Sequence, residues 1–398
     1  MTVLPTIKLL HYHVTNLDSA KIKNNARQIE SARKIIKQFD FDILSLNGVQ
    51  YDLQDVPSKS FRTTGANIGK LIAKWGLKFE SYFFTPSNLG MQAKTKRDGT
   101  YFVDACTPEA LAHADDVNFG TMPGQLSSGG IFKYKISDQK IYTDLSWKDF
   151  NPDVNFARFK TPGGADFPEE MKLFDKSFSD ITIEVGEKNL HIIFLHATPA
   201  HHFGNPRSIN GFRNAEQLRF LEWYVSGETD HSVALSGIKP LKKADYYMIV
   251  GDLNVDINDK EAEGSSVLQS VIEKSTSWIR PDNIAFTCEA AHFGPSPLRL
   301  VLDYIIVSRN IEVLQGKVIH PNFDREELGC GQKPGESPPG RSMVTYKIDE
   351  PDVAGQEVTP SATKDRRDYY AMIDNEYLLF KEASYHYPIY GEFRLGNL

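Results

Sequence analysis

The chain has 398 residues, of which 40% are hydrophobic and 24% are charged, as in an ordinary globular protein. Its formal net charge of −7 disfavours nucleic acid as a partner, because surfaces that bind nucleic acid are usually basic. No apolar run approaches the ~18–20 residues of a membrane span. No signal peptide is visible at the amino terminus. Three widely spaced cysteines, Cys106, Cys288 and Cys330, allow at most one disulfide and leave the redox compartment open.

Strands and helices are predicted to alternate over the first 85 residues. Apolar residues recur at helical spacing between positions 22 and 39, which predicts an amphipathic helix. The flanking segments 7–14 and 40–46 have the pattern of buried strands. A second helix at 66–75 and a strand at 79–84 follow. This order is typical of an α/β layer.

The middle of the chain combines a long loop with two predicted hairpins. Residues 85–130 are rich in Gly, Pro, Asn and Asp, and loops of this length are often functional. One predicted hairpin joins 129–134 to 140–144, and the other joins 178–185 to 190–195. The later elements are predicted as helices at 215–225 and 267–274 and as strands at 246–250, 300–307, 311–318 and 385–393.

The last hundred residues contain a polar stretch. Residues 322–368 hold five prolines, so this stretch is predicted to be an excursion from the fold or to be partly disordered. There is no internal repeat and no clear linker. The simplest organisation is a single α/β domain over residues 1–398 with a polar excursion at about 322–380.

The segment 246–256, YYMIVGDLNVD, is the most informative stretch for function. A buried strand ends at Gly251, and Asp252 and Asn254 then lie two residues apart on one side of the backbone. A carboxylate and an amide at a strand end can order a water, a divalent cation or a phosphate oxygen. The simpler alternative is an ordinary Asx turn. Other polar residues also follow apolar strands: His13, Asn47, His196, Asp303 and His386.

Four motifs resemble, in order, those of the endonuclease/exonuclease/phosphatase superfamily. They are LHATP at 195–199, GDLN at 251–254, LDYIIVS at 302–308 and SYHYPIYGEF at 384–393. The resemblance implies a four-layer α/β sandwich, with two packed and mostly antiparallel sheets flanked by helices. It also implies cleavage of phosphate esters with a divalent metal. Longer stretches, such as 191–220, are similar to a bacterial and usually secreted branch, which implies a secreted or periplasmic location.

The resemblance implies catalytic roles at four positions. His196 would hydrogen-bond the scissile phosphate and stabilise its growing negative charge. Asp252 would orient or deprotonate the attacking water, and Asn254 would fix a phosphate oxygen. His386 would act as the general base or bind the phosphate. The substrate would be a phosphorylated small molecule or a phosphodiester.

The metal site departs from the superfamily pattern. The position of the usual metal-binding Glu is Gly48, the first strand carries His13 where Asn is usual, and Tyr385 replaces an Asp before His386. Candidate ligands are His13 and Asp303. The cation could be Mg²⁺, Mn²⁺, Ca²⁺ or Zn²⁺, and the histidines favour Zn²⁺ or Mn²⁺. Two hypotheses follow: an active phosphoesterase with a rebuilt metal site, or a catalytically impaired protein of the same fold that binds a ligand or partner.

Substrate contacts are assigned to three further residues. Asn88 lies in a matching segment, 85–90, while His201 and Arg213 follow the LHATP motif and could instead belong to a solvated region. A calcium-binding loop of the EF-hand type is a remaining alternative. It fits poorly, because its sixth position is Ile257 rather than Gly and because a strand is predicted before it. Its candidate ligands are Asp252, Asn254, Asp256, Asn258 and Glu263.

Overall fold

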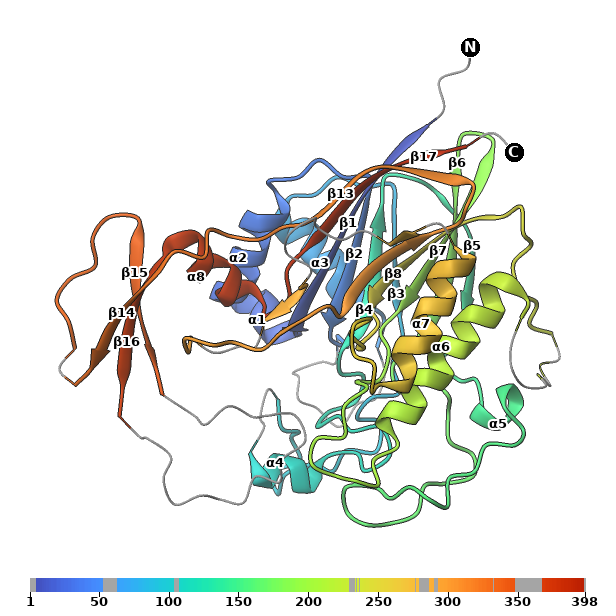
Figure 1. The fold of residues 1–398 in the computed structure, drawn as a ribbon, viewed down its shortest axis with the longest axis horizontal. Coiled ribbons are helices and arrows are strands. Elements are labelled where there is room, and N and C mark those ends of the chain that lie inside the picture. Colours follow the sequence, from blue (N-terminus) through green and yellow to red (C-terminus); the bar gives the residue numbers. More distant parts are fainter. Residues whose placement is uncertain are drawn as a thin grey trace.

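Two six-stranded sheets form the centre of the molecule in the computed structural model (Figure 1). The structure describes residues 5–52, 63–103, 107–228, 233, 235, 237–275, 277–278, 286–289, 293–331, 333–347 and 367–396. The first sheet has the order β13 (Ile311–Val318), β17 (Ile389–Leu395), β1 (Thr6–Leu17), β2 (Ile43–Val49), β4 (Ser127–Phe132) and β3 (Ser81–Thr85). The second has the order β5 (Ile136–Ile141), β6 (Phe178–Val185), β7 (Lys188–Leu195), β8 (Tyr246–Asp252), β12 (Asp303–Val307) and β9 (Ser277–Trp278).

Helices cover the outer face of each sheet (Figure 1). The first sheet is covered by α1 (Ser19–Asn24), α2 (Arg27–Ile36), α3 (Ala66–Trp75) and α8 (Asn375–Ala383). The second is covered by α6 (Asn210–Ser226) and α7 (Glu263–Lys274). The short helices α4 (Pro108–His113) and α5 (Trp147–Phe150) lie in the loops. The layers run helix, sheet, sheet, helix, so the predicted four-layer α/β sandwich is confirmed.

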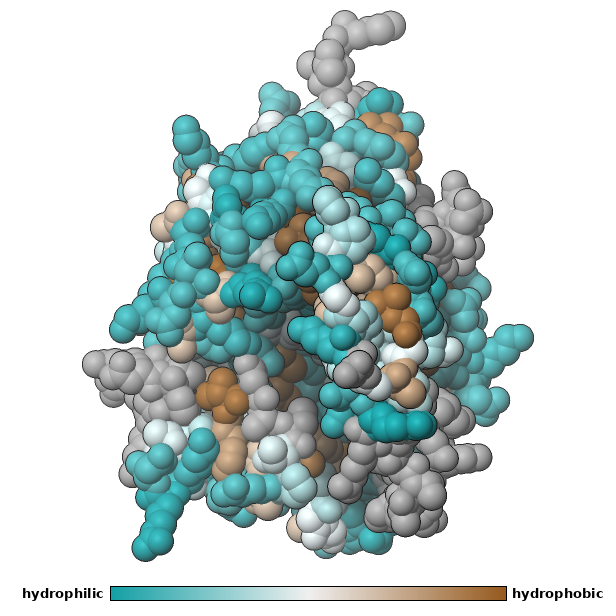
Figure 2. All heavy atoms as spheres, turned by 90° about the vertical axis from the view of Figure 1, so that its left-hand side faces the viewer, coloured by the Kyte–Doolittle hydropathy of each residue, from teal (hydrophilic) through white to brown (hydrophobic). Residues whose placement is uncertain are grey.

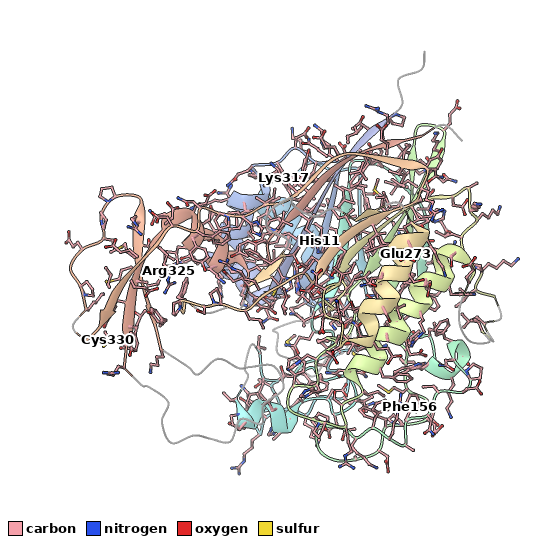
Figure 3. The ribbon with its side chains drawn as sticks, in the orientation of Figure 1. His11, Phe156, Glu273, Lys317, Arg325 and Cys330 are labelled. Atoms are coloured by element: carbon pink, nitrogen blue, oxygen red, sulfur yellow. The ribbon has the colours of Figure 1, made fainter. Side chains whose placement is uncertain are left out.

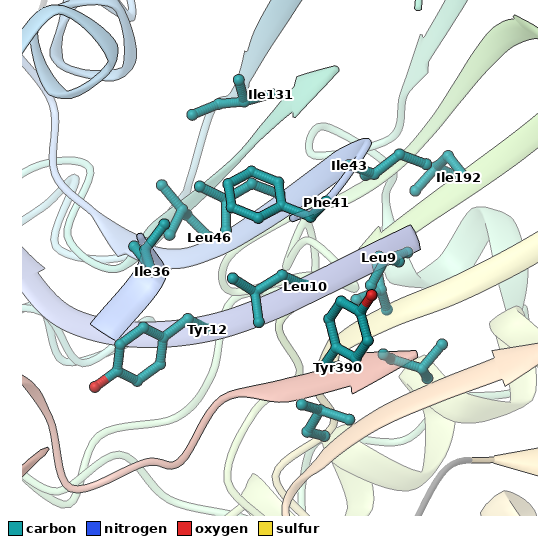
Figure 4. Close-up of a cluster of buried hydrophobic side chains, with 14 of the residues drawn as sticks. Leu9, Leu10, Tyr12, Ile36, Phe41, Ile43, Leu46, Ile131, Ile192 and Tyr390 are labelled. Carbon is teal, nitrogen blue, oxygen red and sulfur yellow. The ribbon is translucent and has the colours of Figure 1, made fainter. Parts of the chain in front are cut away.

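Strand β1 shows how the sequence positions both the core and the site. Successive side chains of a strand point to opposite faces. Leu10 and Tyr12 therefore face the helices of the first layer, while Leu9 faces the second sheet, near Ile43 and Ile192 (Figure 4). The next two residues on the Leu9 face are His11 and His13. The apolar interface between the sheets therefore changes into a polar one toward the end of β1.

Two predicted elements differ in the structure. The predicted helix at 22–39 is two helices, because Asn25 adopts the left-handed conformation (φ 51°, ψ 49°) and ends α1. The predicted hairpin 129–134/140–144 is wrong, because β4 pairs with β2 and β3 while β5 pairs with β6. Alternating apolar residues identify a strand but not its partner. The hairpin of β6 and β7 is confirmed, with Val185 paired to Lys188.

The carboxy-terminal excursion contains regular structure that the sequence did not predict. Strands β14 (Arg325–Cys330), β15 (Arg341–Tyr346) and β16 (Tyr369–Asp374) form a separate sheet in the order β14-β16-β15. Figure 3 places Arg325 and Cys330 on this sheet, far from His11 at the centre of the molecule. The surface on this side is mostly hydrophilic, with scattered hydrophobic patches (Figure 2). The small pair β10 (Cys288–Glu289) and β11 (Arg299–Leu300) completes the set of strands that the structure describes.

The cysteines and the helices bear on two sequence predictions. Cys288 is a buried free thiol and Cys330 an exposed one, while Cys106 lies outside the described residues. Among the helices that the structure describes, none has both the length and the apolar character needed to cross a membrane.

Candidate active site and metal centre

Strands of both sheets bring polar residues to one edge of the sandwich. β1 runs parallel to β2 and β7 runs parallel to β8, so their carboxyl-terminal halves carry His13 and Asn47 from one sheet and Asp252 from the other. β12 is antiparallel to β8 and pairs Asp303 directly with Asp252. His386 lies three residues before β17, which is antiparallel to β1, and so reaches the same edge. The two sheets therefore gather residues as distant along the chain as His13 and His386.

Gly251 sets the close approach of β7 and β8 next to the site. Its φ of +146° and its packing leave no space for a side chain, because a Cβ atom would lie 1.9 Å from the carbonyl oxygen of Leu195. Beyond this point the Ala197 amide donates to the Asp252 carbonyl oxygen at 2.9 Å. The glycine in the GDLN motif therefore allows His196 and Asp252 to lie side by side.

One oxygen of Asp252 is the centre of the cluster. Asp252 Oδ2 lies 3.1 Å from His13 Nδ1, 3.6 Å from His196 Nε2 and 3.9 Å from His386 Nε2. The other oxygen, Oδ1, accepts a hydrogen bond from the Asn254 amide at 2.8 Å. The His13 ring lies 4.1 Å from the His386 ring and 4.8 Å from the His196 ring, measured between centroids. Three of the predicted catalytic residues and one predicted metal ligand therefore surround a single carboxylate.

Asp303 is bonded to two further histidines. Its Oδ2 lies 2.7 Å from His386 Nδ1, and its Oδ1 lies 3.1 Å from His11 Nε2. The other ring nitrogen of His11 contacts Ser45 Oγ at 3.0 Å. Burial acts to raise the pKa of the Asp303 carboxyl, but the charge of His386 and the bond from His11 outweigh burial and hold this pKa well below its usual range. Asp303 is therefore an anion that fixes the His386 ring.

The histidines around Asp252 differ in protonation. Burial lowers the pKa of His13 to about 4, aided by the charge of His386 and opposed by Asp252. Burial and the charge of Lys176 also place the pKa of His196 well below its usual value. Burial alone would lower the pKa of His386, but Asp303 raises this pKa well above its usual value. At neutral pH His386 is therefore a cation, and His13 and His196 are neutral.

Unpaired nitrogen and oxygen atoms at the site fit a cation. Neutral His13 donates from Nδ1 to Asp252, which leaves the lone pair of Nε2 free, and Nε2 is buried without a hydrogen-bond partner. Asn47 Oδ1 and His196 Nδ1 are also buried without a hydrogen-bond partner. His13, Asp252, Asp303 and His386 each offer a ligand atom, and these atoms lie within 4.8 Å of one another. A histidine whose other nitrogen bonds a carboxylate is a common arrangement at metal sites.

The predicted residues Asn254, Asn88, His201 and Arg213 have other partners in the structure. The Asn254 side chain donates to the Ala197 carbonyl at 3.0 Å, and Asn88 bridges two loop carbonyls. Buried Arg213 donates to the carbonyl oxygens of Leu173 and Lys172 at 3.0 and 2.8 Å. His201 is exposed and stacks on a neighbouring ring, 4.9 Å between centroids. The catalytic assignment of Asn254 and the assignment of the other three residues to substrate contacts therefore stay predictions.

The departures from the superfamily pattern also have a structural context. Gly48 has a φ of +89°, and a Cβ atom there would lie 2.3 Å from the Val14 carbonyl oxygen, so the backbone occupies the space of the missing side chain. The Asn47 amide is held by Ser128 Oγ at 2.7 Å. Tyr385 packs against the cluster, with its ring 4.7 Å from His386 and 6.4 Å from His13.

Two residues of the cluster were missed by the sequence interpretation. His11 lies two positions before His13, so both side chains point to the same face of β1, and this spacing is the signal that could have found it. Cys288 forms an isolated antiparallel bridge with His386. No local pattern pointed to Cys288, because its strand has only two residues.

The EF-hand alternative is wrong. The residues before Asp252 form strand β8 instead of a helix. Asp256 accepts hydrogen bonds from the backbone amides of Asn258 and Val301, and Glu263 pairs with Arg219. These side chains therefore do not converge on one loop centre.

Several solved structures are similar to the chain over most of its length. The chain is similar to an endonuclease/exonuclease/phosphatase from Beutenbergia cavernae, with 14% identity, a TM-score of 0.48, and 98% of this chain and 72% of that one covered. It is also similar to sphingomyelinase C from Streptomyces griseocarneus, with 18% identity, a TM-score of 0.46, and 99% and 100% covered. It is similar, too, to beta toxin from Staphylococcus aureus, with 16% identity and a TM-score of 0.45. That likeness covers 97% of this chain and 99% of the toxin chain. No family model and no curated protein sequence matches the chain.

The fold and the site together define an α/β sandwich with a buried His/Asp cluster at one edge of its paired sheets. At these identities the likeness concerns the fold and carries no argument about activity.

Proposed function

We propose that the protein is a metal-dependent phosphoesterase that hydrolyses a phosphate ester by attack of water. The observation that carries the proposal is the buried cluster of His13, Asp252, Asp303 and His386, whose ligand atoms lie within 4.8 Å of one another. The two carboxylates and the neutral imidazole of His13 can neutralise and orient a divalent cation, while protonated His386 lies beside them. The likeness of the motifs to phosphoesterases agrees with this chemistry.

The residues of the chain have distinct roles in this proposal. A bound divalent metal would supply Lewis acidity that offsets charge on the phosphoryl oxygens. Asp252 would orient the attacking water and accept its proton. His386, kept protonated by Asp303, would place a positive charge against the phosphate and could donate a proton to the leaving group. Neutral His196 would hydrogen-bond a phosphoryl oxygen through one of its nitrogens.

The donor set favours Zn²⁺ or Mn²⁺ over Mg²⁺ as the metal. Imidazole nitrogen is a good ligand for Zn²⁺, whereas Mg²⁺ and Ca²⁺ prefer oxygen. In the superfamily pattern that the motifs resemble, a Glu stands at the position of Gly48 and an Asn at that of His13, so one oxygen donor is lost here and another is replaced by a nitrogen donor. The proposed substrate is a phosphorylated small molecule or a phosphodiester, with nucleic acid disfavoured by the net charge. The proposed location is secreted or periplasmic.

The test uses the full chain, stripped with EDTA and resupplied with Mg²⁺, Mn²⁺, Ca²⁺ or Zn²⁺ in turn. Turnover of bis(p-nitrophenyl) phosphate and p-nitrophenyl phosphate is measured together with metal affinity by competition against a chromogenic chelator. We expect turnover with Zn²⁺ or Mn²⁺ to fall by about 10² or more in Asp252→Ala and His196→Ala. We expect Zn²⁺ affinity to fall at least about tenfold in His13→Ala. His113→Ala, outside the cluster, is the control and should match the wild type.

A second candidate function has its own structural support. None of the residues His13, His196, Asp252, Asp303 and His386 is more than 2% exposed. Both oxygens of Asp303 already have histidine partners. These observations favour a catalytically impaired protein that binds a ligand or partner. No turnover with any of the four metals, in a folded protein, would reject the phosphoesterase and leave this second function.

A further inference from the structure

A cavity of about 410 Å³ is lined in part by the loop that follows His196. Its walls come from three separate segments: the loop before α6 together with the first turn of that helix, the segment just before and at the start of α7, and a loop that contains Arg158 and Phe159. A volume of this order suits a small organic molecule.

The floor of the cavity is aromatic. The Phe212 ring stacks on the Phe159 ring at 5.4 Å and on the buried Trp147 ring at 5.5 Å, measured between centroids. The Arg158 guanidinium lies over Phe159 at 4.6 Å and over Phe212 at 4.7 Å. Such stacking holds a guanidinium flat while its edge N–H groups remain available to an anion.

Two arginines at the rim are available to an anion. Arg158 and Arg207 are exposed, and neither forms an ion pair with any residue that the structure describes. The lining also holds two acids: Glu263 is paired with Arg219 at 2.7 Å, an arginine that also pairs with Glu216, and Glu261 faces the same cavity. The rim is therefore balanced in formal charge, and its two guanidiniums without ion-pair partners lie beside an aromatic floor.

We propose that this cavity binds an organic anion whose phosphate or carboxylate group is attached to a flat apolar body. The anion would be held at the edges of Arg158 and Arg207, because a guanidinium matches both groups with two parallel hydrogen bonds. The flat body would lie against Phe212 and Phe159. None of the cluster residues lines the cavity, so the proposed site is separate from the His/Asp cluster and does not depend on its activity.

The cavity is nevertheless joined to the His/Asp cluster through the backbone. Ala200 lines the cavity, and its amide donates to the Asn254 carbonyl at 2.9 Å. Asn254 in turn donates its own amide to Asp252 Oδ1. A ligand in the cavity therefore contacts the loop that begins at His196.

The test titrates the full chain with phenylphosphonate and, in parallel, with benzoate, by isothermal titration calorimetry in EDTA. Phenylphosphonate has a P–C bond and is not a phosphate ester, so hydrolysis does not complicate the measurement. We expect saturable binding that weakens about tenfold in Arg158→Gln and in Arg207→Gln, because each loses a charge-assisted hydrogen bond. Glu261→Gln should bind the anion at least as tightly as the wild type. Tighter binding of phenylphosphonate would indicate a phosphate-like group in the natural ligand, and tighter binding of benzoate would indicate a carboxylate.

Two control variants separate the cavity from other sites. Arg97→Gln removes an exposed arginine outside the cavity and should bind like the wild type. Asp252→Asn disables the His/Asp cluster and should also bind like the wild type, whether or not the protein is a phosphoesterase. Absence of saturable binding of both ligands would overturn the proposal. So would binding that is lost in Asp252→Asn but kept in Arg158→Gln, because that result places the anion at the cluster.

Discussion

At the scale of single residues, the site depends on how burial and charge compete. His13 and His386 have ring centroids 4.1 Å apart, yet their pKa values shift in opposite directions. The difference comes from the partner of each ring. The pKa of His386 is raised by its bond to the anionic Asp303. For His13, burial and the charge of His386 lower the pKa by more than Asp252 raises it. Environments that shift the pKa values of neighbouring titratable groups in opposite directions are typical of acid–base sites. The residue types alone could not have assigned these protonation states.

A second buried pair near the site gives a prediction about pH. Asp175 contacts Lys176 Nζ at 2.8 Å and Thr198 Oγ1 at 2.7 Å. Burial acts to raise the pKa of Asp175, but the charges of Lys176 and Arg213 outweigh burial and lower this pKa from 3.8 to about 2. A lowered folded-state pKa stabilises the fold above the unfolded-state pKa, and this contribution is lost as the pH falls toward the folded-state value.

We therefore expect Asp175 to contribute on the order of 2 kcal/mol to the free energy of unfolding at neutral pH. Urea unfolding should show that Asp175→Asn is less stable than the wild type at pH 7, and that the difference narrows between about pH 5 and pH 3. A difference that stays constant over this range would contradict the assignment. Asp153→Asn, at an exposed loop position, is the control and should follow the wild type at every pH.

At the scale of elements, the irregular end of strand β2 decides which ligands the proposed metal site can contain. The register of β1 and β2 shifts after the pair His13 and Asn47, and Gly48 lies in this irregular segment. The sequence alone suggests that Gly48, which stands where the resembled superfamily has a metal-binding Glu, simply removes one ligand. The structure adds that the Gly48 backbone packs against the Val14 carbonyl oxygen, so the position has no space for the Glu side chain.

Replacing Gly48 should therefore destabilise the fold without restoring a metal ligand. Gly186 is a matched control, because its φ is also positive (+61°) but no atom lies within 4 Å of its Cβ position. We expect Gly186→Ala to cost about 1 kcal/mol and Gly48→Ala to cost roughly 1–3 kcal/mol more, because only the second substitution also forces a steric overlap. Urea unfolding measures both costs. A stable Gly48→Glu variant with increased Mg²⁺ affinity would contradict this expectation.

At the scale of the whole molecule, the two large sheets share an extensive core and the small sheet does not. The inter-sheet core includes fully buried residues from nearly every strand of the first sheet, such as Leu9, Ile43 and Phe393. The sheet of β14, β15 and β16 has a separate buried hydrophobic cluster of Val344, Ala371, Ile373 and Tyr377. Figure 1 shows this sheet at the side of the sandwich, beyond α8.

Hydrogen exchange should reveal this difference in local stability. Regions with few buried apolar contacts open at lower free energy than the core of a fold. We expect the amides of β14, β15 and β16 to exchange faster than those of β1 and β2, measured by mass spectrometry on the full chain near neutral pH. Equal protection of the two regions would contradict this prediction and would show that the small sheet opens only with the whole fold.

Local sequence patterns were enough to predict most of the elements of the sandwich. Apolar residues with a period of two marked β6, β7 and β8, and helical spacing marked α3, because these patterns depend only on neighbours along the chain. The patterns failed where partners are distant. Strand β4 was assigned to β5 although it pairs with β2 and β3, and helix α8 was missed within a polar segment.

The sequence by itself determined the motifs and the fold class, and it predicted the site residues His13, His196, Asp252, Asp303 and His386. Four of these lie within a strongly apolar strand or directly after one, and His386 lies three residues before β17. Strand ends are visible in a linear sequence. Only the tertiary structure decided that His11 bonds Asp303, that His386 carries the positive charge, and that Gly48 has no space for a ligand. These properties depend on contacts between two stacked sheets, so they arise from packing that no stretch of the chain encodes alone.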